Sequence, residues 1–350
     1  MLSALIMAGG KGTRFWPLST EDKPKQFLKL INERTMIQMT VDRIKELIPI
    51  ERIFVCTGEK YVEIVKEQLP ELPERNIIVE PEGRNTAPCI ALSAFMINRI
   101  YKDTNMLVLP SDHLIKKEEE FRKIVTVADK FVEENEEAIV TIGITPTRAE
   151  TGYGYIKYEN QQKTLVNMNH NVIKVEKFVE KPDLETAKRY IDNGHYLWNG
   201  GMFLWSISGI LEKIKEYLPH TYEALHNIEN CEEDILQALI NENYKLTDSI
   251  SIDYGILEKD NQIYVIPSEI DWDDIGSWEA MSRYREKDTK GNINIGDILE
   301  LNSENNLVVS AKHQVIIDNL KDIYVIENNG KIIVGRKENI SNIKNLKEYI

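Results

Sequence analysis

The sequence predicts an α/β protein whose first 140 residues form a doubly wound parallel sheet. Short apolar segments alternate with amphipathic segments in this region, which is the order of strands and helices in such sheets. Glycine-rich or charged loops follow several apolar segments, at the strand ends where open α/β sheets bind ligands. The predicted strands are 4–7, 52–57, 77–80, 106–109 and 138–144, and the predicted helices are 36–47, 60–69, 88–101 and 118–134.

The remainder of the chain divides into two parts. Residues 152–180 alternate apolar and polar positions around a polar loop at 161–171, which predicts a hairpin inserted in a mixed sheet. Helices are expected at 184–193, 207–217 and 232–239. Beyond residue 288, short apolar segments at 307–309, 315–317, 323–326 and 332–334 predict small β coils before a final helix at 340–350. We therefore expect a catalytic domain over 1–288 and a small C-terminal domain over 289–350.

Composition limits the classes of partner. The chain has 350 residues, of which 42% are hydrophobic, enough for a substantial core. Its formal net charge of -14 argues against nucleic acid or an anionic membrane as the main partner. Any phosphate site must therefore be basic locally.

The cysteines and the N-terminus indicate a cytoplasmic protein. Cys56, Cys89 and Cys231 are widely separated and lack metal-site spacing. Because the first two lie in apolar segments, they are expected to be small core residues in a reduced protein. The N-terminus has no cationic region before its apolar run, and no run reaches the roughly 18 residues of a membrane span.

The loop after the first strand carries the strongest indication of function. Three glycines there allow backbone amides to approach an anion: Gly9, Gly10 and Gly12. Nearby cations suit a polyphosphate: Lys11, Arg14 and Lys25. The loop is therefore predicted to bind a nucleoside triphosphate.

Two familiar glycine motifs do not fit this loop. A P-loop requires Ser or Thr after its lysine, and Gly12 follows Lys11 here. A dinucleotide fingerprint requires a third glycine where Phe15 stands. The alternative is that these glycines serve only the geometry of a turn.

The segment PEGRNTAP follows the third predicted strand, which ends at Glu80. Asn85 or Thr86 can cap the next helix, and this structural interpretation explains half of the motif. It explains neither Glu80 nor Arg84. A carboxylate at Glu80 could accept hydrogen bonds from the ring N–H and exocyclic amine of guanine, which would disfavour adenine.

Two aspartates in distant loops are candidates for a metal site. Asp112 follows the fourth strand in LPSDH, and Asp274 lies in IDWDDIGSW. Mg²⁺ typically binds one or two carboxylates together with phosphate oxygens and water, so this pair fits a triphosphate site. The alternative for Asp112 is capping of the following turn.

The ordered motifs resemble those of mannose-1-phosphate guanylyltransferases, in the sugar-phosphate nucleotidyltransferase family. They are AGGKGTRFWPLS, KPKQF, PEGRNTAP, PSDH, TGYGYI, FVEKP, WNGGMFLW, SIDYGILEK and WDDIGSW, and they span about four fifths of the chain. The resemblance implies a Rossmann-like domain with a mixed, mainly parallel sheet. It also implies a small left-handed β-helix-like C-terminal domain that supports a homodimer. The implied reaction converts GTP and mannose 1-phosphate to GDP-mannose and pyrophosphate.

The resemblance also implies residue roles. Nucleotide binding is implied for Ala8, Gly9, Gly10, Gly12, Thr13, Arg14, Lys25, Glu80, Asn85, Thr86 and Asp112. Sugar-phosphate binding is implied for Gly152, Glu180, Lys181 and Asn199. The catalytic set is Arg14, Lys25, Asp112 and Asp274, with Mg²⁺ held by the two aspartates. Alternatives are a related enzyme using another nucleotide or sugar phosphate, and a non-catalytic regulatory relative; VEKP alone also fits a surface turn before a helix.

Overall fold

A computed structural model describes residues 1–10, 12–164 and 170–349. By internal contacts the chain divides into two units. The first comprises Met1–Gly10, Thr40–Ser111 and Ile115–Trp272, and the second Lys11–Met39, Asp112–Leu114 and Asp273–Ile350. The predicted boundary at residue 288 stays a prediction. Lys11, residues 165–169 of the predicted polar loop and the last residue of the predicted final helix lie outside the described residues.

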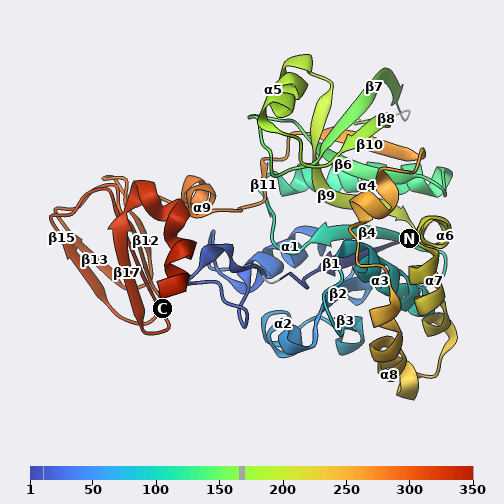
Figure 1. Cartoon of the computed structure of the whole chain (residues 1–350), viewed down its shortest axis with the longest axis horizontal. Coiled ribbons are helices and arrows are strands. Elements are labelled where there is room, and N and C mark those ends of the chain that lie inside the picture. Colours follow the sequence, from blue (N-terminus) through green and yellow to red (C-terminus); the bar gives the residue numbers. More distant parts are fainter. Residues whose placement is uncertain (11, 165–169, 350) are drawn as a thin grey trace. The chain divides into compact units, whose positions relative to one another are not determined.

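The first unit is built on a nine-stranded sheet in the order β3-β2-β1-β4-β9-β6-β10-β8-β7 (Figure 1). β1 runs parallel to β2 and β4, and β2 runs parallel to β3. β9 is antiparallel to both β4 and β6, so the sheet is mixed rather than parallel throughout. The strands are β1 (Leu2–Met7), β2 (Ile53–Gly58), β3 (Ile77–Glu80), β4 (Asn105–Pro110), β6 (Ile139–Ile144), β7 (Tyr155–Thr164), β8 (Asn171–Val179), β9 (Tyr196–Ser206) and β10 (Ile263–Ser268).

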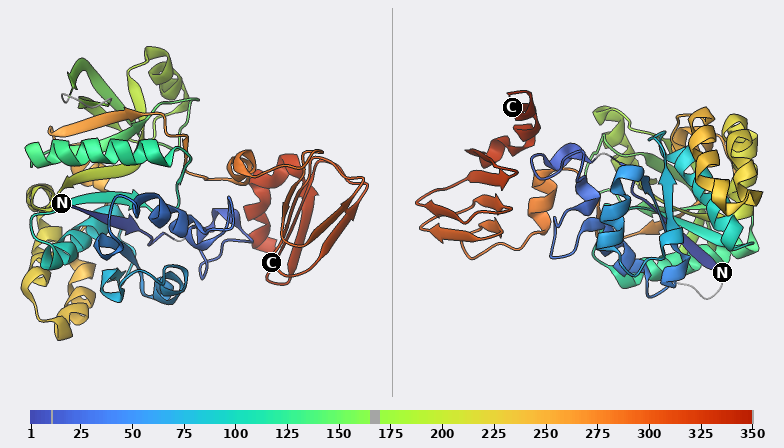
Figure 2. Two further views of the ribbon diagram at one scale, coloured as in Figure 1. Left: turned by 180° about the vertical axis from the view of Figure 1, so that it is seen from behind. Right: turned by 90° about the horizontal axis from the view of Figure 1, so that it is seen from below.

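Helices cover both faces of this sheet, which explains why its central strands are apolar at consecutive positions. α3 (Thr86–Ile100) packs on β1, β2 and β3, whereas α4 (Glu118–Glu134) packs on β4, β6, β9 and β10. α3 lies in front of the sheet in Figure 1, and α4 lies in front in the reversed view of Figure 2. The other helices are α1 (Met36–Ile44), α2 (Val62–Gln68), α5 (Leu184–Asn193), α6 (Ile207–Tyr217), α7 (Pro219–Leu225) and α8 (Glu233–Asn243).

Most predicted elements agree with this order. The predicted hairpin is formed by β7 and β8, which pair with each other in antiparallel register. β8 also pairs with β10 and β7 with β9, so the hairpin extends the main sheet. α7 was not among the predicted helices. No helix in the described part of the chain has the length and apolarity that a membrane span needs.

The second unit joins the N-terminal loop region to the C-terminal strands through a common core. Its buried side chains include Phe15, Leu28, Trp278, Leu307 and Ile340. Two 3-10 turns, Thr13–Phe15 and Lys25–Phe27, lie in its first segment. Two short strands, β5 (Leu114–Ile115) and β11 (Trp272–Asp273), lie where the chain passes from one unit to the other.

Small sheets make up the C-terminal part of the second unit. Parallel strands β12, β14 and β16 are joined by antiparallel β17, and β13 pairs in parallel with β15. The final helix predicted at 340–350 corresponds to a 3-10 helix over Lys337–Tyr349. The elements are α9 (Trp278–Tyr284), β12 (Ile293–Ile295), β13 (Ile298–Leu301), β14 (Leu307–Ser310), β15 (Val315–Asp318), β16 (Ile323–Asn328) and β17 (Lys331–Arg336).

Candidate active site

In the second unit, the glycine loop is folded directly against Lys25. Gly12 has a left-handed backbone, with φ of 36°, and its carbonyl oxygen accepts a hydrogen bond from the Lys25 amide at 3.2 Å. A Cβ atom at Gly12 would lie only 2.7 Å from the Lys25 backbone nitrogen. Glycine is therefore required here both for its conformation and for the close approach. Thr13 and Arg14 follow in an exposed turn.

Lys25 is the centre of a polar network in this unit. Its side chain is only 4% exposed, and Nζ donates a hydrogen bond to Oδ2 of Asp112 at 2.9 Å. Nζ also donates to the backbone carbonyl oxygen of Asp274. The exposed guanidinium of Arg14 lies 3.7 Å from Oδ2 of Asp274. The structure thus brings together the four residues of the predicted catalytic set.

The cations around Asp112 keep its carboxylate charged. Burial alone would raise the pKa of Asp112, but Lys25, His113 and Arg14 together hold it below its ordinary value. An ionised carboxylate is the form that binds a divalent cation. With Asp274 in the same network, the donors are all oxygen, which suits Mg²⁺ better than a thiophilic metal.

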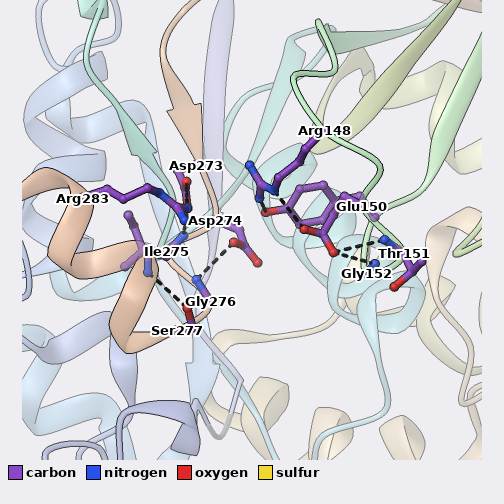
Figure 3. A network of polar contacts seen from close by, with 12 residues as sticks. Arg148, Glu150, Thr151, Gly152, Asp273, Asp274, Ile275, Gly276, Ser277 and Arg283 are labelled. Carbon is purple, nitrogen blue, oxygen red and sulfur yellow. Dashed lines mark hydrogen bonds and ion pairs between the residues drawn. The ribbon is translucent and has the colours of Figure 1, made fainter. Parts of the chain in front are cut away.

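The adjacent aspartates of WDDIGSW have different environments (Figure 3). Asp273 is buried, and its carboxylate accepts hydrogen bonds from the Ile275 amide at 2.8 Å and the Arg283 guanidinium at 2.7 Å. The Asp274 carboxylate accepts from the Gly276 amide at 3.1 Å through Oδ1, leaving Oδ2 beside Arg14. Asp273 therefore anchors α9, whereas the Asp274 carboxylate lies beside Arg14 in the network around Lys25.

In the first unit, Glu80 lies where β3 ends and is 5% exposed. Oε2 accepts a hydrogen bond from the Tyr244 hydroxyl at 2.8 Å. Oε1 lies so close to Gly9 that a Cβ atom there would overlap it, so a larger residue at position 9 would displace the Glu80 carboxylate. Burial raises the pKa of Glu80. Tyr244 was not singled out in the sequence, because nothing local marks its contact with a residue 164 positions away.

The loop residues beside Glu80 also have structural roles. The Asn85 side chain caps α3, accepting a hydrogen bond from the Thr86 amide at 3.0 Å, as the capping interpretation predicts. The Thr86 hydroxyl accepts from the Ile252 amide at 2.8 Å. Ala8 is buried, and its backbone bonds to β2, whereas a Cβ atom at Gly10 would have open space. Nucleotide contacts at these positions stay predictions.

Three of the four predicted sugar residues lie in a second polar group within the first unit: Glu180, Lys181 and Asn199. Oε1 of Glu180 accepts a hydrogen bond from Lys181 Nζ at 2.6 Å. Asn199 Nδ2 donates to Oδ1 of Asp253 at 2.8 Å. The backbone N–H of Asn199 donates to the carbonyl oxygen of Gly154. A Cβ atom at Gly154 would overlap Oε2 of Glu180. Glycine at 154 thus lets the Glu180 and Asn199 segments approach each other.

Asp253 belongs to this polar group, although it was not among the residues predicted from the sequence. Burial, reinforced by the charge of Glu180, raises its pKa to about 6, although Asn199 and Lys181 partly oppose the shift. A shift of this size at a polar cluster is typical of functional sites. The available indication was the motif SIDYGILEK, to which no role was assigned.

The segment around VEKP also has the features of a turn before a helix. Lys181 has a left-handed backbone, with φ of 45°, and Asp183 caps α5 by accepting from the Thr186 amide at 2.8 Å. Trp198, which precedes Asn199 in β9, is buried.

Gly152 belongs to a different loop network (Figure 3). Its amide donates to Oε1 of Glu150 at 3.2 Å, and Arg148 Nε donates to Oε2 of the same carboxylate at 3.2 Å. The Arg148 guanidinium also lies over the Trp198 ring, 5.2 Å from its centroid. These contacts order the loop, but they do not bring Gly152 into the Glu180 group.

Comparison with known proteins places these features in a family. Residues 3–291 match the family model described as nucleotidyl transferase. The chain is 38% identical to a mannose-1-phosphate guanylyltransferase of Salmonella montevideo, over all of this chain and 74% of that protein. It is 37% identical to the xanthan biosynthesis protein XanB of Xanthomonas campestris pv. campestris, over 99% of this chain and 72% of that protein.

A solved structure extends the similarity to the whole fold. It is described as mannose-1-phosphate geranyltransferase from Thermus thermophilus, with 29% identity and a TM-score of 0.83. The match covers 99% of each chain, including the C-terminal strands. The chain therefore belongs to the nucleotidyl transferase family, among the mannose-1-phosphate guanylyltransferases.

Proposed function

We propose that this protein transfers GMP from GTP to α-D-mannose 1-phosphate, giving GDP-mannose and pyrophosphate. The observation that carries the proposal is the network around Lys25, which joins Asp112 and Asp274 and extends to Arg14. This arrangement places cations and carboxylates together, as phosphoryl chemistry requires. Its occurrence in a chain similar to guanylyltransferases over its full length supports the specific reaction.

The acceptor needs no general base. A sugar phosphate has a second pKa near 6 and is mostly dianionic at neutral pH, so its oxygen can attack the α-phosphorus of GTP directly. The barrier comes from the approach of two anions and from charge developing on the leaving pyrophosphate. Lys25 is proposed to neutralise the reacting phosphate, while Arg14 and the amides of Gly9, Gly10 and Gly12, with Thr13, bind the pyrophosphate portion.

We propose Mg²⁺ as the metal, held by Asp112 and Asp274. The ion would neutralise phosphate charge and orient the triphosphate when bound. Lys25 fixes the positions of both metal-binding segments, because its single ammonium bonds to the Asp112 carboxylate and the Asp274 carbonyl. Lys25 therefore both organises the site and acts on the substrate.

Recognition of the base and the sugar is assigned to the first unit. We propose that Glu80 accepts hydrogen bonds from guanine, beside backbone positions at Ala8, Asn85 and Thr86. The Tyr244 contact supports this role because it holds the carboxylate in a fixed orientation. Glu180, Asn199 and Gly152 are proposed to contact mannose, with Lys181 on its phosphate. The Lys181 side chain is exposed, so its ammonium can leave the Glu180 carboxylate and bind a phosphate.

The decisive experiment is a pyrophosphate-release assay that crosses GTP, ATP, UTP and dTTP with mannose and glucose 1-phosphates, with and without Mg²⁺. The fastest release is expected with GTP, mannose 1-phosphate and Mg²⁺. Faster turnover of another pair would reassign the substrates within the family. Absence of release from every pair would favour a regulatory protein that binds nucleotide sugars.

The C-terminal strands are proposed to be coils of a small left-handed β-helix-like domain that forms a homodimer. The parallel pairing of β12, β14 and β16, and of β13 with β15, supports the coiled arrangement. Exposed apolar side chains on β13 and β15 support association: Leu299, Leu301 and Ile316. Sedimentation of the wild type and Ile316→Glu tests the dimer. The proposed location is the cytoplasm.

A further inference from the structure

A compact cluster of three ligand-type side chains lies beside the proposed base site. Cys56 is in β2, Glu80 ends β3, and Cys89 is in the first turn of α3. All three are buried, and one Sγ or carboxylate oxygen of each lies within 4.8 Å of the other two. The sequence places Cys89 33 positions after Cys56, so the cluster arises from the parallel pairing of β2 and β3 beneath α3.

The spacing of these atoms suits a thiophilic metal. Zinc lies about 2.3 Å from sulfur and about 2.0 Å from oxygen in tetrahedral sites, so its ligand atoms are roughly 3.3–3.8 Å apart. Atoms within 4.8 Å of one another can reach that spacing through small side-chain movements. Two thiolates also favour zinc or cadmium over Mg²⁺, which prefers oxygen.

Neighbouring groups already orient this donor set. The Tyr244 hydroxyl donates to Oε2 of Glu80 at 2.8 Å, and Oε1 lies beside Gly9. Ser93 Oγ, one turn later in α3, donates to the Cys89 carbonyl at 2.7 Å. Such outer contacts commonly orient metal ligands.

We propose that Cys56, Cys89 and Glu80 bind a thiophilic divalent cation, with Zn²⁺ or Cd²⁺ as the matching class, and that this binding opposes GTP. Each thiol releases its proton to solvent as its sulfur bonds to the metal. Two protons leave and one divalent cation enters, so the net charge of the buried cluster does not change. This balance makes the exchange compatible with a buried location.

Metal binding would oppose GTP binding because both would use the Glu80 carboxylate. The metal would draw Glu80 toward the thiolates, away from the position from which it would accept the guanine N–H groups. The inhibitory half of this inference therefore rests on the proposed role of Glu80 as the guanine acceptor. Metal binding itself depends only on the three side chains and is measured separately.

Binding is tested by titrating the full-length protein with Cd²⁺ alone and recording thiolate-to-cadmium charge-transfer absorbance. In the wild type and in Cys231→Ser, the absorbance is expected to rise until one equivalent of Cd²⁺ has been added. Cys231 is the matched control because it is the third cysteine and lies outside the cluster. Cys56→Ser and Cys89→Ser should each weaken the band, and the double variant should abolish it. A band that persists in the double variant, or is missing from the wild type, would overturn the site.

Competition is tested by pyrophosphate release at saturating Mg²⁺ with added Zn²⁺. A Zn²⁺ concentration about ten times its Kd should raise the apparent KM for GTP about tenfold and leave kcat nearly unchanged. A zinc-selective chelator should reverse the effect, and the double serine variant should not respond. If the wild type is active and shows the cadmium band, but its KM for GTP does not respond to Zn²⁺, the proposed inhibition is refuted and the metal site is not. Absence of all pyrophosphate release would refute the proposed function while leaving the binding measurement intact.

Discussion

The carboxylates of the two units have opposite electrostatic environments. In the second unit, Asp112 lies against Lys25, and nearby cations lower its pKa although burial opposes the change. In the first unit, burial raises the pKa of Glu80 and of Asp253. Their direct hydrogen-bond partners are a tyrosine hydroxyl and an asparagine amide. The surroundings thus favour the charged form of Asp112 in the second unit and disfavour the charged forms of Glu80 and Asp253 in the first.

This difference matches two chemical tasks. A cation-rich network suits phosphates and a metal, because both must meet fixed charges. Carboxylates whose direct hydrogen-bond partners are neutral donors suit recognition of N–H and O–H groups, where directionality gives specificity. Substitutions in the second unit should therefore change turnover, and those in the first should change substrate preference.

The largest expected effect is that of Lys25→Ala. Removing the ammonium leaves Asp112 without its direct partner and removes charge from the reacting phosphate, so kcat should fall roughly 10³-fold, with a smaller change in KM. Steady-state kinetics with varied GTP and mannose 1-phosphate measure both parameters. Lys29→Ala is the matched control, because the Lys29 ammonium is exposed and lies 3.5 Å from Oε2 of the exposed Glu33. A raised KM with unchanged kcat would reduce Lys25 to a binding residue.

The neighbouring aspartates provide a second contrast. Asp274→Asn should lower kcat about 10²-fold and weaken the response to Mg²⁺, since one metal carboxylate is lost. Asp273→Asn should instead lower the thermal midpoint, because Arg283 loses its charged partner beside α9. Magnesium titrations of activity, together with thermal unfolding, separate the two roles. Equal loss of the Mg²⁺ response in both variants would contradict the assignment.

Glu80→Gln tests base recognition in the first unit. The amide keeps one acceptor oxygen but cannot accept both guanine donors, so the preference for GTP over ATP should fall about 10²-fold. The ratio of kcat/KM for the two nucleotides measures the change. Tyr244→Phe should lower the preference for GTP over ATP by a smaller factor, because it removes only the hydrogen bond that orients Glu80. An unchanged ratio in Glu80→Gln would exclude Glu80 as the guanine acceptor.

The smallest expected effect concerns the pH dependence of stability at Asp253. Its pKa is about 6 in the folded protein, above the ordinary 3.8, so the native state retains a proton that the unfolded chain has lost. Stability should therefore fall as pH rises from about 4 to about 6 and then level off. Asp253→Asn keeps an acceptor for Asn199 but removes the charge, and should be more stable than wild type at pH 7.5 by about 1–2 kcal/mol. Denaturant unfolding of the wild type and the variant at pH 4.5 and 7.5 measures the difference in their free energies of unfolding. A variant that is less stable than the wild type, by a margin that grows with pH, would contradict the prediction.

Agreement between sequence and structure depends on the range of the interaction involved. β3 and α4 have the predicted limits, since hydrophobic periodicity acts within one element. The left-handed backbone of Gly12 agrees with the interpretation of the glycines as serving the geometry of a turn, which is a local property. The antiparallel placement of β9 was not predicted, because strand order in a sheet is set by pairing between distant segments.

The sequence by itself determined the alternation of strands and helices, the glycine-rich turn, and the residue types from which a phosphate site could be built. These properties depend on side-chain period and backbone conformation over a few residues. Only the tertiary structure brought Lys25 to Asp112, 87 positions away, and to Asp274, 249 positions away. It alone distinguished Asp274 from Asp273 and gathered Cys56, Cys89 and Glu80 into one cluster. Burial and the charges of distant neighbours set the chemistry of each group, and both exist only after the chain has folded.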